Sequence, residues 1–174
     1  MTDCLEKIIK NVCKNLFPRN MVAICNELGI KVKESYDLEN DISGLIYKEN
    51  DKYIILVNGF HSPTRQNFTI AHELGHYYKH RAKLDNDSEI VSYIKSRNFD
   101  CPAIPRGNPM LHDKEYNKIE KEANDFAANI LMPKQEFIEQ CCNSNSIEDV
   151  ANYFGVSVSA ASVRANVLGG WFFL

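Results

Sequence analysis

The sequence lacks any long apolar run, since nowhere do about eighteen apolar residues follow one another. A helix needs about 20 mainly apolar residues to cross a bilayer, so we expect no membrane-spanning segment and no membrane partner. The N-terminal stretch MTDCLEKIIKNVCKN carries charges every few positions and has no apolar segment of the signal-peptide type. These absences lead us to expect a cytoplasmic protein.

Positive charge is not in excess, because 20 Lys and Arg residues stand against 23 Asp and Glu residues and give a formal net charge of -3. Proteins that bind nucleic acid or anionic lipid through charge usually carry a basic surplus, so the overall electrostatics favours neither partner. Internal repeats and low-complexity tracts are also absent from the sequence. We therefore expect no direct nucleic-acid binding.

Cys-x-x-Cys motifs are missing, which argues against a zinc ribbon and against a thioredoxin-like redox site. Cys101, directly before Pro102, could act as a nucleophile, but free structural cysteines are far more common. We expect reduced thiols at all six positions, which are Cys4, Cys13, Cys25, Cys101, Cys141 and Cys142.

What is present is the composition of one ordinary soluble domain, with 174 residues, 44% of them hydrophobic and 25% charged. A domain of about 150 residues buries roughly 70% of the surface that its unfolded chain exposes. Neither a disulfide nor a metal is needed to keep such a chain folded, so a metal site is expected to serve a function.

Hydrophobic periodicity predicts several helices around one β-hairpin. The hairpin joins Gly44–Tyr47 to Tyr53–Val57, two β-branched and aromatic runs separated by KENDK. Between about residues 82 and 113 the periodicity fails, which predicts a long connection. The predicted helices cover residues 5–17, 21–28, 63–81, 114–131, 147–154 and 159–168.

The stretch TIAHELGHYYKH, residues 69–80, holds three of the five histidines. On a helix, His72 and His76 lie one turn apart on the same face, so both imidazoles can reach one ion. Glu73 lies roughly 100° round the helix, where it can address a water on that ion. This is the HExxH pattern of the zincins. The alternative is a surface helix that carries two histidines by chance. An apolar stripe beside the histidines argues against it, because such a stripe indicates a helix packed on a core. The stripe consists of Phe68, Ala71, Leu74, Gly75 and Tyr78.

A catalytic zinc ion usually has three protein ligands and a water molecule, so the sequence must supply one more ligand. His80 continues the row of histidines, yet on a straight helix it lies about 12 Å from His72. We expect His80 at the helix cap, behind the ligands or toward a substrate. The spacing does not identify a residue that helps the zinc ion to stabilise the oxyanion of the reaction. The candidates for that role or for substrate contacts are Tyr77, Tyr78, His80, Arg65 and His112.

The predicted helix over residues 114–131 offers a better third ligand. Glu120 falls inside the apolar stripe of this helix, whereas Glu122 lies on its polar face. A carboxylate turned toward a core is costly unless it is paired or binds a metal, so Glu120 is the predicted ligand. Asn124, one turn further, is predicted to orient a histidine ligand through its other ring nitrogen.

The segments RQNFTIAHELGHYYKH and IEKEANDFAANILMP resemble the ImmA/IrrE family, whose usual form is RFTIAHELGH followed by E-x-x-A-N-x-F-A-x-x-L-L-M-P. HELGH followed by Glu-x-x-x-Asn is also similar to the gluzincin metallopeptidases, in which a glutamate from a later helix completes the metal site. The resemblance runs from about Gly44 to Leu168 and includes the hairpin and the C-terminal FGVS helical pair. Gln66 and Asn67 depart from the basic residues that the family often has.

The resemblance implies an α+β fold: a zincin-like metallopeptidase core over residues 1–142, with a small β-sheet and an HExxH helix, and a short helix-turn-helix-like pair over residues 143–174. It implies a cytoplasmic zinc endopeptidase, often carried by a mobile element or prophage, that cleaves a helix-turn-helix repressor and relieves repression. The implied cofactor is Zn2+, and the implied partner is a DNA-binding repressor as protein substrate.

Two alternatives stay open. The chain could be a zinc-containing regulator that binds protein or DNA without proteolysis, or a zinc-stabilised scaffold. The intact Glu73 argues against the scaffold, because a structural site needs no general base. The C-terminal pair is not expected to read DNA, since its second helix offers only Arg164 as a cation. We expect it to serve packing or substrate docking.

Overall fold

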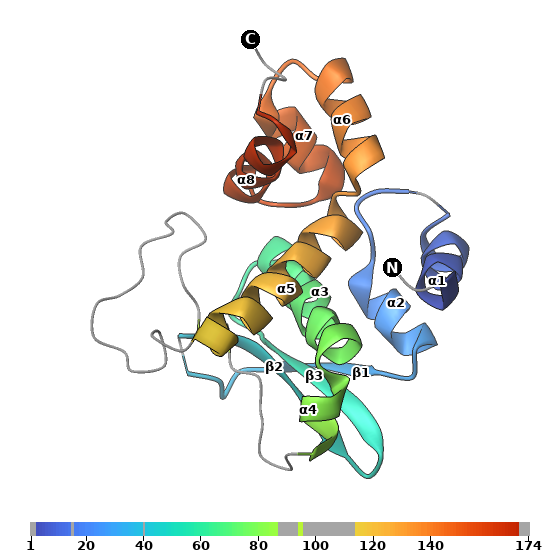
Figure 1. Cartoon of the computed structure of the whole chain (residues 1–174), viewed down its shortest axis with the longest axis vertical. Coiled ribbons are helices and arrows are strands. Elements are labelled where there is room, and N and C mark those ends of the chain that lie inside the picture. Colours follow the sequence, from blue (N-terminus) through green and yellow to red (C-terminus); the bar gives the residue numbers. More distant parts are fainter. Residues whose placement is uncertain (1–2, 15, 40, 87–93, 96–113, 171–174) are drawn as a thin grey trace.

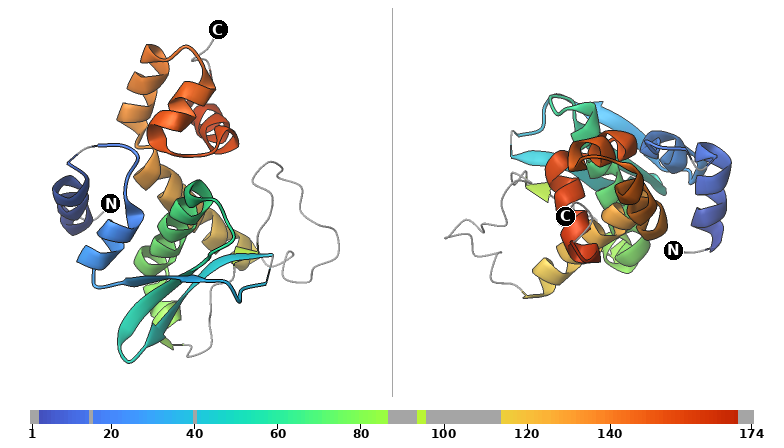
Figure 2. Two further views of the ribbon diagram at one scale, coloured as in Figure 1. Left: turned by 180° about the vertical axis from the view of Figure 1, so that it is seen from behind. Right: turned by 90° about the horizontal axis from the view of Figure 1, so that it is seen from above.

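The computed structural model describes residues 3–14, 16–39, 41–86, 94–95 and 114–170. A small sheet lies at one end, two long helices lie above it, and a group of helices stands at the opposite end (Figure 1, Figure 2). Two N-terminal helices, α1 (Asp3–Cys13) and α2 (Met21–Glu27), lie to one side. The predicted α+β class is confirmed. No helix of these segments is long and apolar enough to cross a membrane.

The sheet has the strand order β1-β3-β2-β4. β2 (Ile42–Glu49) and β3 (Lys52–Asn58) form the predicted antiparallel hairpin. The two residues of its turn have positive φ angles of 48° and 60°, a geometry that matches the twist of paired strands. Two strands that were not predicted flank the hairpin. β1 (Lys31–Ser35) pairs in parallel with β3, and β4 (Ile94–Lys95) pairs antiparallel with β2.

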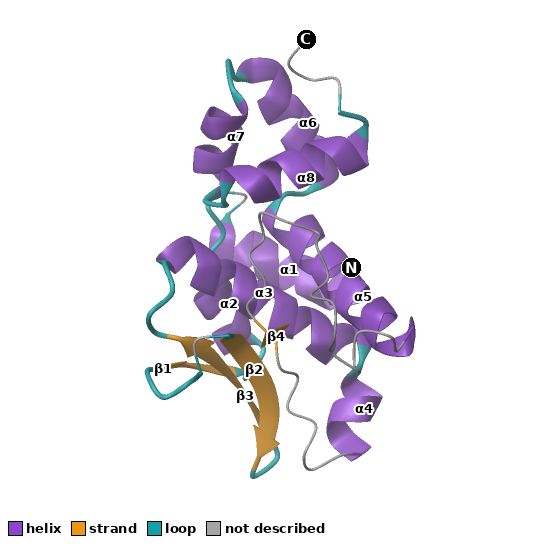
Figure 3. Cartoon of the chain, turned by 90° about the vertical axis from the view of Figure 1, so that its left-hand side faces the viewer, coloured by secondary structure: helices purple, strands orange, loops and turns teal. Residues whose placement is uncertain are grey.

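α3 (Pro63–Lys79) carries the HExxH motif and packs on the sheet (Figure 3). The Ser62 hydroxyl caps its N-terminus by accepting a backbone N–H of the first turn, where a proline also fits. Every residue from 69 to 76 is buried. Gly44 on β2 permits this packing, because a Cβ there would collide with the Thr69 side chain.

α5 (Lys114–Leu131) matches the second predicted long helix and packs against α3. The predicted HExxH helix, expected to reach about Arg81, ends two residues earlier, and α4 (Arg81–Asn86) follows it. The connection predicted over residues 82–113 therefore includes most of α4 and all of β4. Residues 87–93 and 96–113 lie outside the described part of the chain.

The C-terminal helices confirm two predicted elements and add a third. The Ser146 side chain caps α7 (Ile147–Phe154) by accepting a backbone N–H of the first turn, and Gly155 ends this helix in the left-handed conformation. α8 (Val158–Leu168) follows directly. α6 (Lys134–Asn143) was not predicted, although it opens after a proline. The division between residues 142 and 143 falls at the end of α6 and stays a prediction.

Arg164 on α8 ties the C-terminal helices to the end of α5. Its Nε donates a hydrogen bond to the Met132 carbonyl oxygen at 3.0 Å, and its Nη2 donates to Asn129 Oδ1 at 2.8 Å. Only 6% of the residue is exposed. The single cation of the second C-terminal helix is therefore used inside the protein.

The first helix is shorter than predicted, because α1 ends at Cys13 and does not reach Phe17. Lys14 has a φ of 48°, which is incompatible with a continuing right-handed helix. Phe17 instead turns toward α7, where its ring centroid lies 4.7 Å from that of Phe154. Contacts with a distant helix thus decide where α1 ends.

Candidate metal centre

Two histidines from α3 and a glutamate from α5 converge at one point. The Nε2 atoms of His72 and His76 lie 2.9 Å apart. Glu120 places one carboxylate oxygen 3.3 Å from His72 Nε2 and the other 3.4 Å from His76 Nε2. The structure thus brings together the three residues that were predicted as metal ligands.

The outer nitrogens of the two histidines are held by further hydrogen bonds. His72 Nδ1 donates to Asn124 Oδ1 at 2.8 Å, so its Nε2 lone pair points into the cluster. His76 Nδ1 lies 3.1 Å from His80 Nδ1. His80 Nε2 in turn donates to Glu122 Oε2 at 3.0 Å. Each of the two central imidazoles therefore has a fixed neighbour behind it.

The protonation states suit a metal site. Burial alone would raise the pKa of Glu120, but the close approach of His72 and His76 outweighs burial and lowers that pKa to about 2. Burial lowers the pKa of His76, which favours its neutral form. Metal binding needs an ionised carboxylate and neutral imidazoles, and these are the forms that the site favours.

The spacing of the three groups also fits a small tetrahedral ion. Zinc binds imidazole nitrogen and carboxylate oxygen at about 2.0 to 2.2 Å, so two such ligand atoms on one tetrahedral ion lie roughly 3.3 Å apart. The observed separations of 2.9, 3.3 and 3.4 Å are close to that value. Two nitrogen lone pairs and a carboxylate facing one another repel unless a cation lies among them. The residues present therefore fit a metal ion.

Glu73 lies on α3 directly after His72 and is fully buried, with 0% exposure. It lies in a run of buried residues on α3, from Thr69 to His76. A carboxylate fixed in the residue after the first candidate ligand can serve as a base toward a water on the ion.

Comparison with known proteins agrees with this chemistry. A family model for peptidase M78, the IrrE N-terminal-like domain, matches residues 25–99 and 105–166, which is most of the chain. The chain belongs to this peptidase family. The resemblance seen in the two sequence motifs is therefore confirmed, and the family is one of peptidases.

Individual relatives extend the comparison. Metallopeptidase ImmA of Bacillus subtilis (strain 168) is 27% identical over 170 residues, which cover 94% of this chain and 85% of the relative. A solved structure of a Mycobacterium tuberculosis transcriptional regulator is similar with a TM-score of 0.59, at 17% identity over 95% of this chain. The chain spans 47% of the length of that structure, and at this identity the likeness concerns the fold alone.

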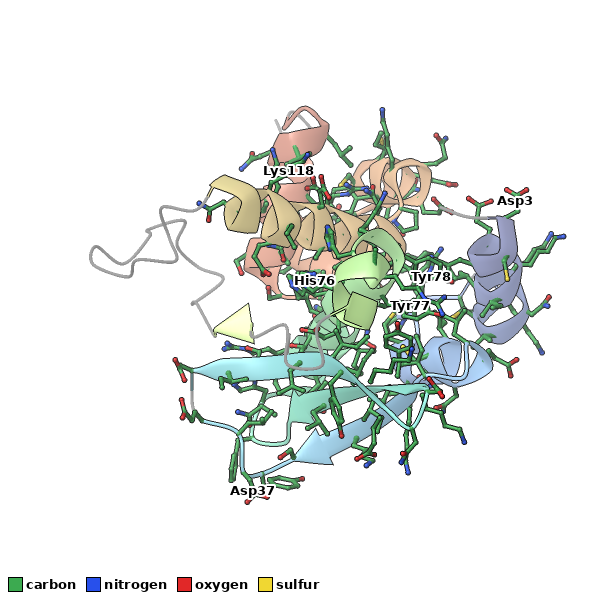
Figure 4. The ribbon with its side chains drawn as sticks, turned by 60° about the horizontal axis from the view of Figure 1, so that its bottom comes forward. Asp3, Asp37, His76, Tyr77, Tyr78 and Lys118 are labelled. Atoms are coloured by element: carbon green, nitrogen blue, oxygen red, sulfur yellow. The ribbon has the colours of Figure 1, made fainter. Side chains whose placement is uncertain are left out.

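Tyr77 and Tyr78, the two tyrosines considered for oxyanion or substrate contacts, pack against other aromatic rings. The Tyr77 ring packs edge-on against Tyr53 on β3, with 4.9 Å between centroids. Tyr78 stacks on Phe126 of α5 at 5.7 Å. Figure 4 shows His76 to the left of α3 and both tyrosines to its right. Neither tyrosine is brought to the candidate ligands in this arrangement.

The remaining three candidates have different surroundings. Arg65 lies two turns before His72 on the same face of α3 and donates from Nη2 to Ser43 Oγ on β2 at 3.0 Å. Its Nε is buried and has no hydrogen-bond partner among the described residues. Both ring nitrogens of His80 are engaged behind His76, which leaves none for an oxyanion. His112 lies outside the described residues.

Sequence reasoning missed the connection between Glu122 and the site. The polar-face position of Glu122 excluded it as a ligand, and the structure keeps it out of the cluster. Its hydrogen bond to His80 lowers the pKa of the Glu122 carboxyl. Glu122 also lines an open hollow of about 710 Å³ beside α3 and α5, which none of the three candidate ligands lines. The sequence signal that could have indicated this connection was His80, one turn after His76, which needs its own hydrogen-bond partner.

Proposed function

We propose that this chain is a zinc-dependent endopeptidase, a peptide-bond hydrolase acting on a protein substrate. The observation that carries the proposal is the convergence of His72, His76 and Glu120 beside the buried Glu73. The distances among the ligand atoms suit a tetrahedral ion, and membership in a peptidase family supports the reaction class.

In the proposed mechanism, His72, His76 and Glu120 hold the ion, and Glu73 moves the proton. Zinc, when bound, acidifies a water molecule and polarises the peptide carbonyl. The Glu73 carboxylate accepts a proton from the water molecule while the water oxygen bonds to the carbonyl carbon of the peptide. When the carbon–nitrogen bond breaks, Glu73 gives that proton to the leaving amine. Asn124 keeps the His72 ring in the orientation that this chemistry needs.

The substrate is proposed to bind as an extended segment along the edge of β2. β4 pairs with this edge only at Ile42 and Gly44, so among the described residues the edge from Leu45 to Glu49 is left for a substrate strand. α3 packs on β2 where Thr69 meets Gly44, one turn before His72. A strand added at this edge would therefore pass near the candidate ligands and near Arg65, whose Nη2 donates to Ser43 of β2.

The proposed substrate is a helix-turn-helix transcriptional repressor of a mobile element or prophage, cleaved in the cytoplasm so that the silenced genes are released. This step rests on the family resemblance. Residues 143–174 are proposed as a separate module that packs on the core and docks the substrate, because their only helical cation, Arg164, is buried.

A second candidate is a zinc-containing regulator that binds protein or DNA without cleaving it. The observation behind it is the fold likeness to a protein described as a transcriptional regulator. The candidate does not explain why a fully buried glutamate follows His72, since ligand binding alone needs no base.

The experiment is incubation of the purified zinc-loaded protein with any helix-turn-helix repressor encoded beside its gene, followed by mass spectrometry of the products. We expect cleavage at one site, loss of cleavage with a chelator or in His72→Ala, and recovery when zinc is returned to the chelated wild type. A repressor that stays intact but is released from its operator would replace the peptidase with the regulator.

A further inference from the structure

A chain of three hydrogen-bonded side chains runs outward from one candidate ligand. His76 Nδ1 lies 3.1 Å from His80 Nδ1, and His80 Nε2 lies 3.0 Å from Glu122 Oε2. The His80 side chain is 9% exposed and that of Glu122 41% exposed. The chain therefore begins in the buried cluster and ends at a carboxylate in contact with solvent.

The Glu122 carboxylate at the outer end of this chain determines which ring nitrogens of His80 and His76 carry a proton. An ionised carboxylate only accepts hydrogen bonds, so His80 Nε2 must carry the proton that it donates to Glu122. In neutral His80 the Nδ1 atom is then an acceptor, and His76 Nδ1 must donate to it. His76 is thereby left with a bare Nε2, which lies 2.9 Å from His72 Nε2 and 3.4 Å from Glu120.

The opposite arrangement is unfavourable. If His80 Nδ1 carried the only ring proton, its bare Nε2 would face the Glu122 carboxylate with no hydrogen between them. If His76 carried its proton on Nε2, that hydrogen would occupy the place where three ligand atoms converge. With neutral imidazoles, one proton arrangement places a hydrogen in both contacts of His80, and it is the one that leaves His76 Nε2 bare to bind a cation.

We propose that His80 and Glu122 are positioning residues for His76: together they fix its tautomer and ring orientation, and so strengthen metal binding by the His72–His76–Glu120 cluster. The proposal rests on the metal centre of the proposed function. It gives His80 a place behind the ligands and gives Glu122 a purpose that its polar-face position did not suggest.

The two histidine ligands are then supported in different ways by the same helix. Asn124 of α5 holds His72 directly at 2.8 Å. Glu122 of α5 holds His76 only through His80, the C-cap residue of α3, which lies one turn after the ligand. Because α5 also supplies Glu120, a displacement of this helix would disturb all three candidate ligands at once.

The test measures zinc affinity by competition with a chromophoric chelator, in the full chain and without any peptidase assay. Outer hydrogen-bond partners of metal-bound histidine typically change metal affinity by 10- to 100-fold. We expect a loss in this range for His80→Leu, which can neither accept from His76 nor donate to Glu122. His80→Gln, whose amide offers an acceptor and a donor, should recover most of the affinity.

Glu122 provides a second arm that leaves the packing of His80 in place. Glu122→Leu should weaken zinc binding, and Glu122→Gln, which keeps an acceptor, should weaken it less. Lys121→Ala is the matched control, because Lys121 is an exposed neighbour of Glu122 on the same helix and takes no part in the hydrogen bonds and ion pairs described for His80 and Glu122. Its zinc affinity should equal that of the wild type.

Thermal unfolding of each metal-free variant separates a positioning role from loss of the fold, and the visible spectrum of the cobalt-loaded protein reports ligand geometry. Equal zinc affinity in the wild type, His80→Leu and Glu122→Leu would overturn the proposal, as would a loss in His80→Leu that His80→Gln does not recover. A wild type that binds zinc but cleaves nothing would remove the peptidase function and leave this proposal intact.

Discussion

Gly75 on α3 faces Ala123 on α5 so closely that a Cβ on Gly75 would lie 3.0 Å from both the Cα and the carbonyl oxygen of Ala123. Both obstacles are backbone atoms, which cannot move aside like the end of a flexible side chain. This contact lets the two helices approach, and that approach brings Glu120 to within 3.3 Å of His72.

Replacing Gly75 by Ala sets two effects of opposite sign against each other. Ala favours a helix over Gly by about 0.5 to 1 kcal/mol, whereas overpacking a tight contact costs about 1 to 3 kcal/mol. We expect the clash to win, so that Gly75→Ala unfolds at a lower temperature without metal and binds zinc more weakly. A variant that is more stable than the wild type and binds zinc equally well would mean that the two helices move apart at this contact without cost.

Glu120 and Glu122 are two residues apart and should behave differently when each is changed to Gln. Glu120→Gln replaces an ionised candidate ligand with a neutral amide, so we expect most of the bound zinc to be lost after dialysis. Glu122→Gln should retain zinc, with affinity reduced by less than about 10-fold because it acts only through His80. Elemental analysis of both proteins makes the comparison. Metal loss from Glu122→Gln alone would exclude Glu120 as the ligand.

Much of this arrangement could be predicted because local signals were strong. The polar KENDK stretch marked the hairpin turn, and the helix predicted from residue 63 begins there as α3. The position of Glu120 in the apolar stripe of α5 pointed to a buried carboxylate, and the structure places it beside the histidines.

Other features depend on contacts that no local pattern contains. β1, with the sequence KVKES, is a strand because it pairs in parallel with β3, not because its own residues alternate cleanly. α1 ends early because Phe17 packs against Phe154 from the far end of the chain. The hydrogen bond between His80 and Glu122 joins the C-cap of α3 to α5, and only the fold brings these two positions together.

The C-terminal helices should not bind DNA, because Arg164 is committed to Asn129 and the Met132 carbonyl. We expect the full chain to show no salt-dependent binding to duplex DNA in fluorescence anisotropy, even at low ionic strength, where phosphate contacts are strongest. Arg164→Met should lower the free energy of unfolding by about 1 to 3 kcal/mol, since the buried acceptors lose a charged donor. Tight duplex binding that Arg164→Met abolished would reverse this assignment.

The cysteines should differ sharply in reactivity. Burial raises the pKa of Cys25 to about 12, so its thiol stays protonated at pH 7 and at about pH 9. Cys4 and Cys142 are exposed. We expect a thiol reagent to label Cys4 and Cys142 in the folded protein and to leave Cys25 unlabelled at both pH values, as mapped by peptide mass spectrometry. Fast native labelling of Cys25 would show that its surroundings open readily.

Glu73 should be required for cleavage but not for the metal. Glu73→Gln keeps the shape of the side chain and leaves His72, His76 and Glu120 unchanged, so we expect the wild-type fold and zinc content. What is lost is the proton acceptor, and general-base catalysis is typically worth about 10²- to 10⁴-fold. Cleavage of the partner repressor should fall by that factor, while His72→Ala should lose both zinc and activity. A wild-type cleavage rate in zinc-loaded Glu73→Gln would assign the base to another group, and Arg65, a permanent cation, could not replace it.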